Sequence, residues 1–252
     1  MVNVDTVYQR VLALANKEQR GYITPQEFNL FANQAQMDIF EQYFYDLNQF
    51  GRLPGNDTEY SDMLNYLEQK INIFETSKDI SINNATEFYN LSAQINNLYR
   101  IGSVSDFYSD IAQTSYGGST SVSGYGDVTC EQVNAKDIVT INSAPLTKPT
   151  ESRPIYVLKD NKIYIYPRTI IGDITVNYIK TPEKVNWTYI VVGEKPLLNV
   201  GAIDYKDFEL HPSEETKLVI KILGLAGITL KDPNLYQIAA TEDIENTQQE
   251  KQ

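Results

Sequence analysis

The sequence predicts an α+β protein with an N-terminal helical bundle, a central antiparallel β domain, and C-terminal helices that pack back on the bundle. Apolar residues recur at helical spacing through residues 1–79. Short stretches that alternate between apolar and polar residues occupy 80–200, and helical spacing returns over 201–252. A chain of 252 residues buries enough surface to fold without disulfides or metals, so we expect three regions with these boundaries.

The first region is expected to contain three helices. In the first of them, Val7, Val11 and Leu14 share one face. The second helix is predicted over 25–49, with an apolar stripe wide enough to be covered on two sides. The third helix has apolar residues at alternating steps of four and three, namely Tyr60, Leu64, Leu67, Ile71 and Phe74.

Residues 16–27, NKEQRGYITPQE, fit the spacing of an EF-hand calcium loop in part. Gly21 falls at position 6 of such a loop and Glu27 at position 12, where a turn glycine and a bidentate glutamate belong. However, Asn16 replaces the usual first aspartate, and Arg20 puts a cation where an oxygen ligand is needed. A small calcium-binding module therefore remains only an alternative.

The same residues also form a helix–turn–helix corner. Thr24 and Glu27 have the spacing of a capping box, and Pro25 occupies the first helical position between them. Gly21 can adopt the left-handed conformation that ends the preceding helix. This structural interpretation accounts for more of the residues than calcium binding does.

The middle region is expected to be mostly strand. Residues 162–166 alternate in polarity, 155–158 precede them across a hairpin signal at 159–161, and 174–179 form another predicted strand. A Gly/Ser-rich loop is expected at 116–127, and the stretch around Trp187 and its neighbouring prolines is predicted to be loop.

The third region is expected to be helical. Ser213 is predicted to cap a helix whose apolar positions are Leu218, Ile222 and Leu225. Asp232 and Pro233 stop this helix and are predicted to begin another. The polar C-terminal end is expected to fray.

The composition disfavours several classes of function. The formal charge is −12, and Lys and Arg form no cluster, which argues against nucleic-acid binding. The longest apolar run, 218–230, is too short to span a bilayer, and no signal peptide is expected. Cys130 is the only cysteine and has no basic neighbour, so we expect it to be inert.

One group of residues suggests chemistry. Asp207, Glu209, His211 and Glu214 lie close together in sequence and could ligate a metal, but carboxylates are also common at helix N-termini. His211 is the only histidine, so a small hydrolase would have to use it as its base. No constellation selects a catalytic site, and we expect neither enzymatic activity nor a cofactor.

Four segments of the chain carry a resemblance to a known family. They are VDTVYQRVLALANKEQRGYITPQEFNLFANQAQ at 4–36, FYNLSAQINNLYRIGSV at 88–104, RPIYVLKDNKIYIYPRTIIGDITVNYIKTPEKVNW at 153–187 and FELHPSEETKLVIKILGLAGITLKDP at 208–233. In this order they resemble the ring proteins, or head–tail connector adaptors, of crAss-like and related podovirus-type bacteriophages. The resemblance covers most of the chain as an order of segments rather than a catalytic motif.

The resemblance implies a structural role in the virion. Such proteins are made in the host cytoplasm and form a ring below the portal, expected here to contain about twelve copies. The ring contacts the portal protein and other ring or tail proteins of the neck, and DNA passes through its channel without sequence-specific binding. No membrane partner is implied. A tail-tube or other virion component is the structural alternative.

Three segments are expected to form subunit or portal contacts: the helix at 25–49, the loop at 116–126, and the helix after Pro233. Each of these segments is expected to have either surplus apolar surface or surplus flexibility. The candidate contact residues are Phe28, Phe31, Phe40, Phe44, Tyr116, Val122, Tyr125, Leu235, Tyr236 and Ile238.

Overall fold

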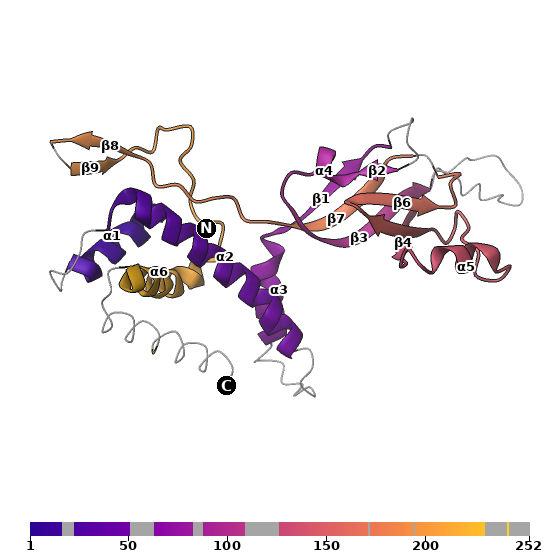
Figure 1. The fold of residues 1–252 in the computed structure, drawn as a ribbon, viewed down its shortest axis with the longest axis horizontal. Coiled ribbons are helices and arrows are strands. Elements are labelled where there is room, and N and C mark those ends of the chain that lie inside the picture. Colours follow the sequence, from indigo (N-terminus) through magenta and orange to yellow (C-terminus); the bar gives the residue numbers. More distant parts are fainter. Residues whose placement is uncertain are drawn as a thin grey trace, which may run out of the picture. The chain divides into compact units, whose positions relative to one another are not determined.

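The computed structural model describes residues 1–16, 23–50, 63–82, 88–108, 126–170, 172–193, 195–229 and 241 (Figure 1). The chain forms two compact units, one from residues 1–74 together with 182–252, and the other from residues 75–181. Both boundaries of the β unit therefore lie earlier in the chain than the predicted 80 and 200. The mixed α+β class is confirmed.

The helical unit joins the two ends of the chain. α6 packs against both α1 and α2, which confirms that the C-terminal region packs back on the N-terminal helices. The helical elements are α1 (Val4–Asn16), α2 (Pro25–Phe50), α3 (Met63–Asn72), the 3-10 turn η1 (Pro212–Glu214) and α6 (Glu215–Thr229). The core is filled by buried side chains that include Val7, Val11, Phe28, Ala32, Ile39, Phe40, Leu67, Ile71, Phe74, Leu218 and Ile222.

Two apolar residues on the predicted helix faces are not buried. Leu14 and Leu64 are exposed, and Ala15 rather than Leu14 continues the buried face of α1. Both residues lie at the margin of an apolar stripe, where the neighbouring helix rather than the helical period decides which side chain is covered. Tyr60 lies outside the described residues.

The predicted cap of α2 is confirmed, and the predicted cap of the C-terminal helix is wrong. The backbone N–H of Thr24 donates to Glu27 Oε2 at 2.9 Å, and Glu27 N–H donates to Thr24 Oγ1 at 3.3 Å. Ser213, by contrast, lies inside η1. The cap is His211, whose Nδ1 accepts from Ser213 N–H at 3.2 Å.

The β unit contains one seven-stranded sheet in the order β1-β7-β3-β4-β5-β6-β2. The strands are antiparallel, as predicted, except that β4 and β5 run parallel. The elements are β1 (Glu75–Ile80), β2 (Tyr89–Asn90), α4 (Leu91–Gln94), β3 (Leu98–Tyr108), β4 (Gly126–Gln132), α5 (Ile138–Ser143), β5 (Ile155–Lys159), β6 (Lys162–Tyr166) and β7 (Ile174–Lys180).

This sheet curls around its own core. Ile80 on edge strand β1 and Tyr89 on the opposite edge strand β2 belong to the same buried cluster as Val104 in the middle of the sheet. In a flat seven-stranded sheet the two edges would lie about 28 Å apart. Curling brings the edges toward each other, and both faces of the cluster are then supplied by one sheet.

Local sequence signals predicted the hairpin turn more accurately than they predicted the strands. The β5–β6 hairpin is confirmed, and its two turn residues have the positive φ values that a type I′ turn requires: 52° at Asp160 and 56° at Asn161. Residues 75–79, predicted as the end of the helical region, instead form most of β1 and pair with β7. The stretch after Trp187, predicted as loop, contains β8 (Tyr189–Val192) and β9 (Lys195–Leu198).

A buried ion pair fixes α3 against the start of α6. Lys70 Nζ pairs with a carboxylate oxygen of Glu214, and the two side chains are only 5% and 2% exposed. The ammonium also lies 4.3 Å from the ring centroid of Tyr66 and 5.6 Å from that of Tyr43. Removing either charge would leave the other desolvated without its partner.

Replacing Lys70 with Met is therefore expected to lower the free energy of unfolding by about 3–5 kcal/mol, measured by urea denaturation. Arg153, which pairs with Glu131 where the side chains are 75% and 62% exposed, provides the control. Arg153→Met should cost less than about 1 kcal/mol. Equal losses from the two substitutions would contradict the structural role of the buried pair.

The stability of the start of α2 should depend on pH. Hydrogen bonds from the Thr24 backbone and hydroxyl lower the pKa of Glu27 from its ordinary value of 4.5. The stabilisation is present above 4.5 and is lost as the pH falls through the lowered pKa. In an NMR titration, Thr24→Ala should move the pKa of Glu27 back toward 4.5, and an unchanged pKa would contradict the assignment.

Candidate functional site

Three amide side chains form a polar stripe along α2. Asn29, Asn33 and Gln36 follow one another at steps of four and three residues, so they point from the same side of the helix. They hold an extended stretch of backbone, residues 183–187, which we call the anchor segment. The predictions from sequence did not single out these residues, although polar amides at helical spacing beside an apolar face were the available signal.

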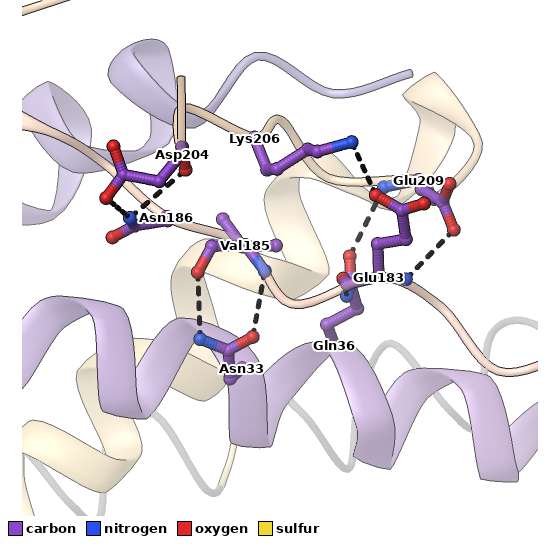
Figure 2. Close-up of polar contacts among 8 residues, drawn as sticks. All are labelled: Asn33, Gln36, Glu183, Val185, Asn186, Asp204, Lys206 and Glu209. Atoms are coloured by element: carbon purple, nitrogen blue, oxygen red, sulfur yellow. Dashed lines mark hydrogen bonds and ion pairs between the residues drawn. The ribbon is translucent and has the colours of Figure 1, made fainter. Parts of the chain in front are cut away.

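The hydrogen bonds of this stripe resemble a strand ladder made by side chains, and Figure 2 shows Asn33 and Gln36 beside the segment they hold. Asn33 Nδ2 donates to the Val185 carbonyl at 2.9 Å, and Val185 N–H donates to Asn33 Oδ1 at 2.9 Å. Trp187 N–H donates to Asn29 Oδ1 at 2.9 Å, and Gln36 Nε2 donates to the Glu183 carbonyl at 2.8 Å. Alternate residues of the anchor segment are thus fixed to α2.

The other edge of the anchor segment is held by residues 204–209. Asn186 forms an antiparallel bridge with Lys206, and its Nδ2 donates to a carboxylate oxygen of Asp204 at 2.9 Å. Lys206 Nζ lies 2.6 Å from a carboxylate oxygen of Glu183, and this hydrogen bond and charge raise the pKa of Lys206. Figure 2 shows the segment held from both sides.

Trp187 locks the end of the anchor segment into the core. Its indole N–H donates to Asp5 Oδ1 at 2.9 Å, and its ring centroid lies 4.2 Å from that of Tyr8 in α1. The ring also stacks with Tyr189, at a centroid distance of 5.8 Å and an interplanar angle of 19°. Because Tyr189 begins β8, this stack fixes the root of the strands that follow.

Residues 189–203, which we call the arm, expose most of their large apolar side chains. β8 and β9 form an antiparallel two-stranded ribbon, drawn in Figure 1 beside the helices of its own unit. A ribbon of two strands is only marginally stable by itself and needs an apolar face to be covered. The exposed apolar residues of the arm are Ile190, Val191, Val192, Leu197, Val200 and Ile203.

The predicted contact residues on α2 divide into two groups. Phe28 and Phe40 have no exposed surface in the chain because their rings fill the core of the helical unit, so they are not surface contacts. Phe31 and Phe44 are half-buried. The other predicted contact residues, Tyr116, Val122, Tyr125, Leu235, Tyr236 and Ile238, lie outside the described residues, as does the Gly/Ser-rich loop.

The residues considered as metal ligands are held apart by hydrogen bonds to different elements. Asp207 accepts from Val4 N–H at 2.8 Å, and Glu209 accepts from Glu183 N–H at 3.0 Å, while Glu214 pairs with Lys70. Across the described part of the chain, no three His, Cys, Asp or Glu side chains gather as metal ligands.

The remaining candidates for chemistry also have structural partners. His211 Nδ1 lies 2.8 Å from Ser213 Oγ, but the same nitrogen caps the following turn. Cys130 is buried inside the β unit. Of the proposed calcium loop, residues 17–22 lie outside the described residues, and the Glu27 carboxylate accepts from Thr24.

Comparison of the chain with protein-family models and with curated proteins finds no match. No helix in the described ranges is long and apolar enough to cross a membrane.

Replacing Asn33 with Leu tests the polar stripe. The substitution leaves the part-buried N–H and carbonyl of Val185 without these partners, which should lower the free energy of unfolding by about 1–3 kcal/mol. Urea denaturation followed by Trp187 fluorescence measures the loss, and hydrogen exchange at Val185 should accelerate. Gln34→Leu, at an exposed position one residue along α2, should change the free energy by about 0.5 kcal/mol or less. An Asn33 variant as stable as this control would contradict the anchoring role.

Proposed function

We propose that this chain is a non-enzymatic structural protein of a bacteriophage particle, a subunit of the ring that joins head to tail below the portal. The proposal combines the resemblance of its segments to connector ring proteins with the anchored arm of the helical unit. Its partners would be further copies of itself, the portal protein, and other ring or tail proteins, with DNA passing through the central channel.

The distribution of exposed apolar side chains carries the proposal. Of the sixteen large hydrophobic residues exposed in the described part of the chain, six lie between 190 and 203. Clustered apolar surface of this kind usually marks a protein contact, whereas single exposed residues are ordinary. The arm is also fixed at its root, so docking it would cost little conformational entropy.

Electrostatics is compatible with a channel component. The formal charge of −12 repels a phosphate backbone, which favours passage of DNA over tight binding. The four residues considered for metal binding or catalysis, Asp207, Glu209, His211 and Glu214, are engaged in a cap, backbone hydrogen bonds and an ion pair. These observations support a structural role for the chain.

The copy number of the protein in purified phage particles tests the proposal. Quantitative mass spectrometry should find a ratio near one to the portal protein, which corresponds to about twelve copies in a closed ring. A ratio many times higher would assign the chain to the tail tube or shell. Absence from the particle would overturn the structural role.

The arm should be needed for assembly and dispensable for folding. The triple variant Ile190→Ser/Val192→Ser/Leu197→Ser should leave the thermal midpoint nearly unchanged, because exposed substitutions cost about 0.5 kcal/mol or less each. Its incorporation into particles, measured against the portal protein, should fall strongly. Val139→Ser on α5 replaces a similarly exposed side chain and should be incorporated normally. Normal incorporation of the triple variant would exclude the arm as the contact.

A further inference from the structure

We propose that the arm of one chain docks on the solvent-facing side of α2 in a second copy of the same chain. The inference rests on the proposed ring function and names the contact that would build the ring. The two contacting surfaces, the arm and the outer side of α2, are different surfaces of one helical unit. The contact can therefore repeat from copy to copy.

The donor surface is one face of the β8–β9 ribbon. Ile190 pairs with Leu197, and Val192 pairs with Lys195, so all four side chains project from the same face. The three apolar residues are 50%, 49% and 55% exposed for Ile190, Leu197 and Val192, respectively. Lys195 is exposed as well. This face is apolar with a single cation near the turn.

The acceptor surface is the side of α2 opposite the core. Leu30 is 71% exposed and Tyr45 is 65% exposed, and Glu41 lies on the same side of the helix between them. Leu30 and Tyr45 are separated by 15 helical steps, or about 22 Å along the axis, which is longer than a four-residue strand. The 26 residues of α2 include no Lys, Arg or His but four acids, Glu27, Asp38, Glu41 and the buried Asp46.

Charge complementarity selects this pairing. Copies with a net charge of −12 repel one another in general, so a stable contact must set apolar surface and a cation against an acidic face. The arm face offers Lys195, and α2 offers Glu41 among exposed apolar side chains. A lipid surface fits less well, because the charged Lys195 next to the turn would have to enter the bilayer.

The symmetry of the contact agrees with a ring. A contact between two different patches is heterologous, and it closes into a ring when the rotation between neighbours allows. Pairing of two arms with each other would instead give a two-fold dimer in which α2 takes no part. The two arrangements predict different cross-links.

Site-directed cross-linking of the purified full chain separates them. A concentrated mixture of the Val192→Cys chain and the Tyr45→Cys chain is treated with a short bis-maleimide. The yield of covalent heterodimer should exceed the yield from a mixture of the Val139→Cys and Tyr45→Cys chains by about tenfold or more. Docking would hold the two thiols at a high effective concentration. The parent chain, whose only thiol is the buried Cys130, should not cross-link.

Three results would overturn the assignment. One is a heterodimer yield equal to that of the control mixture, and another is a dimer of the Val192→Cys chain with itself, which would show that arms pair with arms.

The third result would come from charge reversal. Lys195→Glu should weaken self-association in analytical ultracentrifugation by about tenfold, and the double variant Lys195→Glu/Glu41→Lys should restore it. Failure of the double variant to recover would place Lys195 against another surface.

The inference and the proposed function can fail separately. Portal-equivalent copy number in particles without the cross-link would mean that the ring uses another contact. Cross-linking and charge rescue in a protein absent from particles would mean that the chain self-associates but is not an adaptor. Only the first outcome removes the docking of the arm on α2.

Discussion

The helical unit depends on the hydrogen bonds that α2 makes with the returning chain. The backbone leaves this unit to build the whole β unit and comes back at residue 182 as an extended segment. Buried backbone N–H and carbonyl groups need partners, and the backbone of α2 is already satisfied within its own helix. Asn29, Asn33 and Gln36 supply the partners, because one amide side chain both donates and accepts.

The same hydrogen bonds also fix the root of the arm, the surface that we assign to assembly. The anchor segment ends at Trp187, whose indole donates to Asp5 and packs against Tyr8 and Tyr189. The arm therefore starts from a fixed point even though its apolar residues are exposed. A ribbon prepared in this way gives up less conformational freedom on docking than a free loop would.

The residues considered as metal ligands or catalytic groups also hold structural elements together. Asp207, Glu209, His211 and Glu214 are near neighbours in sequence, but they bond to the N-terminus of α1, the anchor segment, η1 and α3 respectively. Carboxylates and imidazoles are strong acceptors, so a short segment that crosses several elements can use each of them at a different junction. Their proximity along the chain therefore did not imply a shared site.

The sequence by itself determined the features that depend on a few adjacent residues. These include the α+β class, the Thr24–Glu27 cap, the turn at Asp160 and Asn161, and the extent of α2, because capping, left-handed turns and helical periodicity are local. Tertiary structure alone decided that Phe28 and Phe40 are core while the apolar residues of the arm are exposed. It also placed 75–80 in a strand and 182–200 in the helical unit. Burial and strand pairing depend on partners distant in the chain, which no local pattern specifies.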